Sequence, residues 1–231
     1  MHRQPIPRLS RATGHREGVA GRRLPPRRGR GRSVGSRRAS RARALPPRLE
    51  RYTEVRQRIA DGDLLLVRRR GLIAIAGRGV HCHAAKAAWW GNDLFCLEVT
   101  GFFGGRAVLL SEMVGRLPGR IDVFEVNPDG RWPDYDRHGA TRRMRRLCGC
   151  RYGYAGLIGA ALLHLPVVRW FVRPELDDEA FDRRPPFCSQ ACAMADRLGG
   201  GVDPVPHLAD RLTEPADLAR SPLYRYRFTL I

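Results

Sequence analysis

Lysine is almost absent from this chain of 231 residues, in which Lys86 is the single lysine among 42 lysine and arginine residues. We expect no secretory leader either, because the arginine-rich N-terminus contains no continuous apolar stretch. The longest apolar run, from Tyr154 to Val172, is interrupted by a histidine, a proline and an arginine, so it falls short of the roughly 20 apolar residues of a membrane span. We therefore expect a cytoplasmic protein with no transmembrane segment, while release from the cell by another route stays open.

The first fifty residues lack aromatic side chains and cysteine. They hold fifteen arginines, six prolines and six glycines, and their only acidic residues are Glu17 and Glu50. Such a segment cannot bury enough apolar surface to offset the entropy that ordering it would cost. We therefore predict a disordered arginine-rich tail over residues 1–50 and one folded domain over residues 51–231.

The charge of the tail allows three interpretations. Guanidinium groups bind phosphates without needing a fold, which favours a nucleic-acid partner. The tail is equally well explained as a passive segment, or as a stretch translated from a wrongly chosen start. Residues 51–231 contain no nucleic-acid-binding motif, so we expect nucleic-acid binding only through the tail.

The six cysteines suit neither a disulfide framework nor a metal-binding module. A cytosolic chain keeps such thiols reduced. Cys148 and Cys150 are separated by one residue instead of the two of a Cys-x-x-Cys pair, and no second pair stands at ligand spacing. We therefore expect no cofactor.

Cys188 stands where a nucleophilic cysteine is expected. It follows Pro185-Pro186 and opens a stretch with helical spacing that runs over residues 188–198 and stops at three glycines. A thiol in the first turn of a helix meets free backbone N–H groups and the positive end of the helix dipole, and both favour the thiolate. The alternative is that Cys188 is a small core residue, because free cysteines are among the most buried residues.

A base and its orienting group lie upstream of Cys188. His81, Cys82 and His83 fall in a strand-like segment, and Glu98 falls in the next one, on the face opposite Leu97. Cys188, His83 and Glu98 thus have the residue types of a cysteine-hydrolase triad: nucleophile, general base and orienting carboxylate. The same strand also allows a second interpretation, a metal-dependent hydrolase in which His81, His83 and Glu98 hold zinc.

The coarse secondary-structure pattern predicts an α+β domain. We expect a short helix near 52–59, strands near 64–69, 72–76, 79–87, 94–99 and 121–126, and helices near 107–116 and 142–147. The helix that begins at Cys188 is expected to pack against the sheet.

Several short motifs, in order, resemble one family, the circularly permuted papain-like amidases of the YiiX/YaeF-like branch of the NlpC superfamily. The matching segments are Gly62-Asp63 at the first strand, Cys82-His83-Ala84-Ala85 at the base strand, Glu98, Cys188-Ser189-Gln190 at the nucleophile, and Glu214–Pro222 near the end. The resemblance covers about residues 58–231. It implies a permuted papain-like fold, with an antiparallel sheet packed against the nucleophile helix, and a cysteine hydrolase that uses His83 as its base.

The resemblance also limits what is known of the substrate. It allows amide bonds in peptides or cell-wall fragments, and lipid acyl or ester bonds. His81, Cys82, Ser189 and Gln190 are the candidate pocket residues. Cys82 replaces the small hydroxyl residue of the family motif and Gln190 replaces its glutamate, so a third interpretation is a catalytically inactive papain-like binding module with a basic tail.

Overall fold

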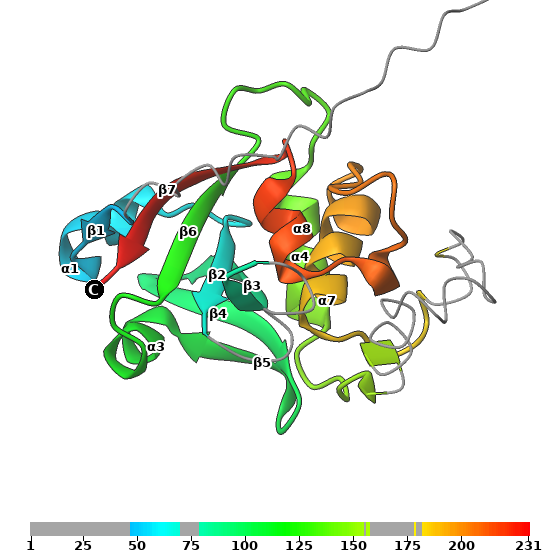
Figure 1. The fold of residues 1–231 in the computed structure, drawn as a ribbon, viewed down its shortest axis with the longest axis horizontal. Coiled ribbons are helices and arrows are strands. Elements are labelled where there is room, and N and C mark those ends of the chain that lie inside the picture. Colours follow the sequence, from blue (N-terminus) through cyan, green and yellow to red (C-terminus); the bar gives the residue numbers. More distant parts are fainter. Residues whose placement is uncertain (1–46, 70–78, 155, 158–177, 179–181) are drawn as a thin grey trace, which may run out of the picture. The chain divides into compact units, whose positions relative to one another are not determined.

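The computed structural model describes residues 47–69, 79–154, 156–157, 178 and 182–231, all within the unit Leu45–Ile231. Figure 1 shows a curved sheet with helices on both faces. The strand expected at 72–76 and residues 1–46 of the tail lie outside the described residues. The described strands are β1 Leu49–Glu50, β2 Leu64–Arg68, β3 His81–Trp90, β4 Asp93–Thr100, β5 Gly104–Leu109, β6 Ile121–Val126 and β7 Tyr224–Leu230.

These strands form one sheet of seven in the order β1-β7-β6-β2-β3-β4-β5. Every neighbouring pair is antiparallel except β1 and β7. The α+β class is therefore confirmed, whereas the expected antiparallel sheet is a mixed one. The parallel edge arises because the backbone N–H groups of Thr229 and Ile231 donate to the carbonyls of Arg48 and Glu50, at 2.8 and 2.9 Å.

The described helices divide between the two faces of the sheet. They are α1 Tyr52–Val55, the 3-10 turn η1 Arg56–Arg58, α3 Leu110–Arg116, α4 Arg137–Arg146, α7 Cys188–Met194, the π-helical turn η2 Ala195–Gly199, the 3-10 turn η3 Asp210–Leu212 and α8 Pro215–Arg220. None of the helices in the described part of the chain is long and apolar enough to cross a membrane.

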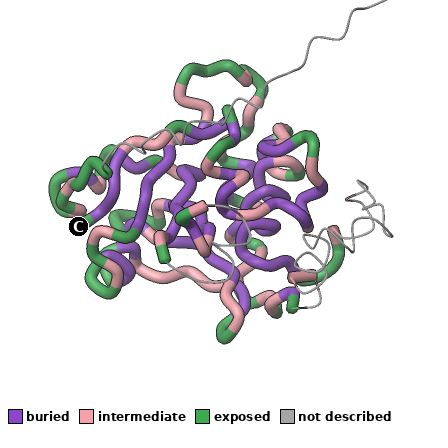
Figure 2. The backbone as a smooth tube through the Cα atoms, in the orientation of Figure 1, coloured by how far each residue is buried: buried purple, intermediate pink, exposed green. Residues whose placement is uncertain are grey.

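Alternation along the strands creates one apolar core on each face of the sheet. On β2, Leu64 and Leu66 join the core beneath α4, α7 and α8, whereas Leu65 and Val67 join the core beneath α1 and α3. Figure 2 shows this burial running through the central strands and through α7. Side chains on successive strand positions point to opposite faces, so the strands supply both cores at once.

The helix expected over residues 107–116 is partly wrong, because residues 104–109 form β5. Gly104 has φ +66°, a conformation that suits glycine, and a Cβ on Gly105 would lie 1.8 Å from the Leu147 carbonyl. These two glycines let the chain turn sharply after β4 and run back beside it. The helix then begins at Leu110, and Leu110 and Met113 are buried.

The nucleophile helix was expected over 188–198, and the structure divides this stretch. Residues 188–194 are α-helical and completely buried, and the last turn widens into the π-helical η2, which ends at Gly199. The expected arginine-rich helix is α4, in which Met144 faces the core and the Asp136 carboxylate caps the first turn by accepting from the Gly139 N–H at 2.8 Å.

Candidate functional site

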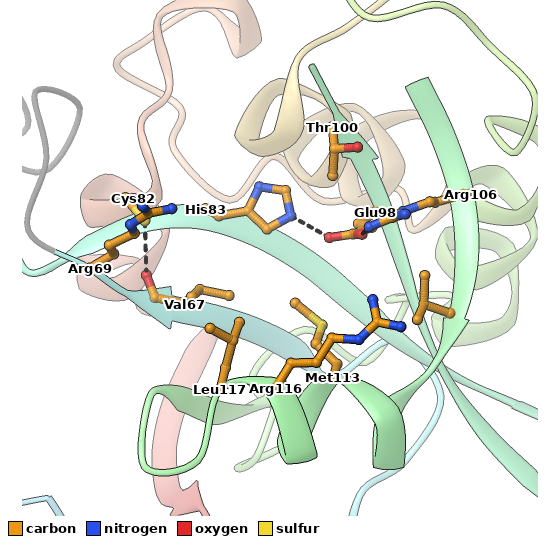
Figure 3. A pocket seen from close by; sticks show the side chains of 11 residues that line it. Val67, Arg69, Cys82, His83, Glu98, Thr100, Arg106, Met113, Arg116 and Leu117 are labelled. Carbon is orange, nitrogen blue, oxygen red and sulfur yellow. Dashed lines mark hydrogen bonds and ion pairs between the residues drawn. The ribbon is translucent and has the colours of Figure 1, made fainter. Parts of the chain in front are cut away.

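His83 and Glu98 form a hydrogen-bonded pair on adjacent strands. Glu98 lies opposite Ala85 in the register of β3 and β4, so His83 is its diagonal neighbour on the same face. The His83 Nε2 and a Glu98 carboxylate oxygen are 2.7 Å apart, and the carboxylate is 4 % exposed. Figure 3 shows this contact at the back of a pocket.

Arg106 holds the second oxygen of Glu98. It lies directly opposite Glu98 in the register of β4 and β5, and its Nε and Nη2 reach Oε1 at 2.8 and 2.6 Å. Burial raises the pKa of Glu98, but the hydrogen bonds and charges of His83 and Arg106 outweigh burial and hold the pKa below its usual value. Glu98 is therefore a carboxylate that stays ionised beside the imidazole.

Cys188, the first residue of α7, approaches the same imidazole from the helix side. Its thiol lies close enough to the His83 ring and to the backbone N–H groups of Ala84 and Ser189 for all three to lower its pKa. Because Glu98 occupies Nε2 of the ring, Nδ1 is the nitrogen left for the sulfur. The three residues therefore form a continuous chain, thiol to imidazole to carboxylate.

The charges of Cys188, His83 and Glu98 stabilise one another. Burial raises the pKa of Cys188, but the hydrogen bond and charge of His83 outweigh it and bring the pKa below that of an ordinary thiol. Burial lowers the pKa of His83, yet Cys188 and Glu98 together raise it to about 10. The arrangement thus favours a thiolate beside an imidazolium.

Close backbone packing fixes the start of α7. The Gly153 N–H donates to the Pro186 carbonyl at 3.1 Å, and a Cβ on Gly153 would lie 2.0 Å from the Pro185 carbonyl oxygen. Tyr152, the neighbouring residue, packs against Cys188. No side chain larger than hydrogen fits between these two segments, so Gly153 sets the position of the cysteine.

Two of the candidate pocket residues instead anchor α7. The Ser189 hydroxyl donates to the Thr213 carbonyl at 2.7 Å. The Gln190 side-chain oxygen accepts from the Phe187 N–H at 3.4 Å. Both side chains are buried, and neither is among the residues that line the described pocket.

His81 belongs to a separate cluster. Its Nε2 lies 2.7 Å from a carboxylate oxygen of Asp122, which also accepts from Arg68 and Thr229 at 2.6 Å each, and its ring packs edge-on against Phe124 at 5.9 Å. The structure therefore gives His81 and His83 different carboxylates.

The donor side chains that the structure describes near His83 do not gather into a metal site. Among the described residues, no three histidine, cysteine or acidic side chains converge in a way that would hold a metal ion. His81, His83 and Glu98 do not form a common ligand set, so the residues present do not fit the metal site that the sequence left open.

A pocket of about 370 Å³ opens beside His83 and Glu98, on the face of the sheet that α3 covers. Eleven residues line it: Val67, Arg69, Cys82, His83, Glu98, Thr100, Arg106, Val108, Met113, Arg116 and Leu117. Cys82, one of the candidate pocket residues, lines this cavity, and its sulfur is 3.6 Å from the Val67 carbonyl oxygen. Figure 3 shows residues of β2, β3, β4 and α3 around the cavity.

Sequence reasoning missed Arg106 and Tyr152 as site residues. Arg106 was hidden because residues near it were expected to begin a helix. The signal that reveals it is the run Gly101–Gly105, whose glycines mark a hairpin turn and so place Arg106 across from Glu98. Tyr152 carries no such signal, because only the folded chain brings it next to Cys188.

Comparisons with known proteins concern the fold alone. No family model and no curated protein matches this chain. Five chains of solved structures match it, and one is the crystal structure of the metalloprotein yiiX from Escherichia coli O157:H7, DUF1105. The two share 11 % sequence identity at a TM-score of 0.52, over 74 % of this chain and 97 % of that one. The YiiX-like character expected from the sequence motifs is therefore confirmed for the fold.

Proposed function

We propose that this protein is a cysteine hydrolase in which Cys188 is the nucleophile, His83 the general base and Glu98 the group that orients the imidazole. The observation that carries the proposal is that His83 lies between Cys188, whose pKa it lowers, and Glu98, whose carboxylate is 2.7 Å from the ring. The two outer residues of the triad each have a further partner suited to their role. The Cys188 sulfur has backbone donors, and the Glu98 carboxylate has Arg106.

The reaction follows from these contacts. The Cys188 sulfur attacks the substrate carbonyl carbon, and the carbonyl oxygen becomes an oxyanion that the Cys188 N–H at the helix start helps to stabilise. His83 then gives its proton to the leaving amine or alcohol as the carbon–heteroatom bond breaks, which leaves a thioester on Cys188. Water attacks the thioester, His83 takes a proton from the water, and the acid is released.

The fold and the chain order support a finer classification. The similarity to yiiX concerns the fold, and the order His83, Glu98, Cys188 is the reverse of ordinary papain-like enzymes. We place the chain in a permuted papain-like, NlpC-type class on this basis. Its substrates would be amides of peptides or cell-wall fragments, or acyl esters of lipids.

The description of yiiX as a metalloprotein makes metal chemistry the second candidate. The donor set here does not favour it, because His81 is engaged by Asp122 and His83 by Glu98.

Acylation of the thiol tests the proposal directly. The full-length protein is mixed with p-nitrophenyl acetate, and the acetyl-enzyme is trapped by acid and located by peptide mass spectrometry. We expect acetyl on Cys188 in the wild-type protein and in the control Cys192→Ala, and none in Cys188→Ala or, at matched times, in His83→Ala. An acetyl group on Cys82 or Cys192, or no acetyl-enzyme in the wild-type protein, would contradict the assignment and favour an inactive binding module.

A further inference from the structure

The pocket beside His83 carries more positive charge than the proposed chemistry uses. Arg69, Arg106 and Arg116 line it, and Glu98 is the single acidic residue among its lining residues. The two oxygens of Glu98 already accept from His83 and Arg106. Glu98 therefore neutralises one arginine, and the charges of Arg69 and Arg116 remain uncompensated within the pocket.

These two arginines also lack strong partners elsewhere. Arg116 has a contact of 3.4 Å with Glu112, in which both side chains are more than half exposed. Such a solvent-exposed pair contributes little. Arg69 is exposed, and no ion pair joins it to a residue within the described part of the chain. In Figure 3 Arg69 lies at the Cys82 end of the pocket, and the guanidinium of Arg116 extends from α3 toward Glu98.

The rest of the pocket is apolar. Val67, Val108, Met113 and Leu117 form its walls, and Met113 and Val67 are also part of the core beneath α3. The hydroxyl of Thr100 is buried without a hydrogen-bond partner among the described residues. A buried hydroxyl without a partner is costly unless a ligand or water supplies one. The lining thus combines an apolar wall, one buried hydroxyl without a partner among the described residues, and two exposed guanidinium groups, of which Arg116 has only a weak contact with Glu112.

We propose that this pocket binds an apolar group that ends in an oxyanion, a carboxylate or a phosphate, with the oxyanion paired to Arg116 and the positive charge of Arg69, at the other end of the pocket, adding to the attraction. The planar guanidinium presents parallel N–H donors that match two oxygens of either group. The inference that this ligand is the substrate rests on the proposed function. If the ligand is the substrate, the substrate class narrows to acyl compounds that carry a negative charge next to an apolar segment.

Binding is measured on the full chain with the Cys188→Ala substitution, so that no chemistry takes place. The probes are hexanoate, hexyl phosphate and the neutral hexanamide, titrated by calorimetry at fixed salt. We expect at least one of the two anions to bind about tenfold or more tightly than hexanamide, because a charge-assisted pair is lost in the amide. The anion that binds more tightly identifies carboxylate or phosphate as the group.

Arginine substitutions then locate the site. Arg116→Gln, and to a smaller extent Arg69→Gln, should bring the Kd of the preferred anion close to that of hexanamide. Arg220→Gln is the matched control, since Arg220 is an exposed arginine paired with Asp217 on α8. Equal Kd values for the anions and hexanamide, or equal effects of Arg116→Gln and Arg220→Gln, would overturn the proposal. Because the assay needs no thiol, a negative result here is distinct from a failure to form the acetyl-enzyme.

Discussion

Glu98 and Arg106 stand opposite each other on β4 and β5, so the carboxylate that orients His83 is itself held by a cross-strand ion pair. Both nitrogens of Arg106 reach one oxygen of Glu98, and His83 takes the other oxygen. The carboxylate therefore cannot rotate without breaking one of these contacts. Its position is set by sheet register, which is more rigid than a loop.

Arg106 is accordingly a positioning residue. In Arg106→Gln we expect the rate of Cys188 acetylation to fall about tenfold, against roughly 100-fold or more in His83→Ala, which removes the base itself. The Arg106→Lys variant should recover part of the loss, because it keeps a positive charge beside Glu98. Rates from stopped-flow release of p-nitrophenol provide the measurement, and a rate in Arg106→Gln as low as in His83→Ala would contradict a positioning role.

The pH dependence of acetylation should show an acid limb that lies low for a thiol. The pKa of Cys188 is lowered, mainly by His83 against the opposing effect of burial, so release of p-nitrophenol should begin below the pH at which an ordinary thiol ionises. The pKa of His83 is about 10, and above it the ring has no proton for an amine leaving group, so cleavage of an amide should fall there, whereas p-nitrophenolate leaves without a proton and needs no such donor.

The Glu98→Gln variant shows in which direction Glu98 shifts the ionisation of the Cys188–His83 pair. Loss of the carboxylate charge lowers the pKa of His83 and weakens its stabilisation of the thiolate, so the acid limb for iodoacetamide labelling of Cys188 should move to higher pH. Glu54→Gln, on the exposed side of α1, is the control and should leave the limb in place. An unchanged limb in Glu98→Gln would mean that Glu98 does not act on the Cys188–His83 pair.

Lys86 should be essential for stability. It is fully buried, and its three donors reach the Asp196 carboxylate at 2.7 Å, the Tyr224 hydroxyl at 2.9 Å and the Gly62 carbonyl at 3.1 Å. Lys86→Met leaves the buried Asp196 carboxylate without a countercharge, with only the Tyr135 and Tyr224 hydroxyls donating to it, and should cost about 3–5 kcal/mol of unfolding free energy. Lys86→Arg should also destabilise, because a planar fork cannot reach the same three acceptors.

Urea unfolding followed by circular dichroism measures both Lys86 variants. The double variant Lys86→Met/Asp196→Asn should recover part of the loss, since it removes the uncompensated charge. A loss below about 1 kcal/mol in Lys86→Met would show that the cluster contributes little, as exposed ion pairs do.

The start of the folded domain can be located by truncation. A protein that starts at Leu45 should keep the thermal stability of the full chain, because it retains β1 and its bonds to β7. A protein that starts at Tyr52 loses the Arg48 and Glu50 carbonyls that accept from Thr229 and Ile231, and its Tm should be lower by several degrees. Acetylation of Cys188 should persist in the longer version, because no proposed site residue lies in the removed segment. Equal Tm values for the two truncations would show that β1 is dispensable.

Local patterns in the sequence predicted the central strands and the start of α7. The alternation around Leu64 to Val67, and the double proline before Cys188, are signals that a few neighbouring residues carry. The short strand Leu49–Glu50 carries no such signal, because two residues become a strand only when β7 lies beside them. β7 itself, Tyr224–Leu230, was not expected at all, although its residues alternate between aromatic and charged.

In the site too, local sequence patterns predicted some contacts, whereas others depend on the folded chain. Strand alternation suggested that Glu98 could orient His83, and the two are in contact. Alternation also predicted that His81 lies on the same face as His83. In the structure the register of β2 with β3 shifts between Val67 and Arg68, and His81 contacts a different carboxylate, that of Asp122 on β6. Which acid a strand histidine meets depends on the order of strands in the sheet, and that order is not written in any local pattern.

The parallel pairing of β1 with β7 brings the N-terminal and C-terminal ends of the described domain side by side, so that joining them would give a circular polypeptide. The Tyr52 N–H donates to the Ile231 carbonyl at 2.9 Å, so the two ends of the described domain already touch. A short linker between them, with a new opening at the exposed turn around Gly130, would leave every strand pairing in place. In such a chain Cys188 would be synthesised before His83 and Glu98. The order in which the nucleophile and the base are translated therefore depends only on where the chain begins and ends. The geometry that brings the two residues together does not depend on that order.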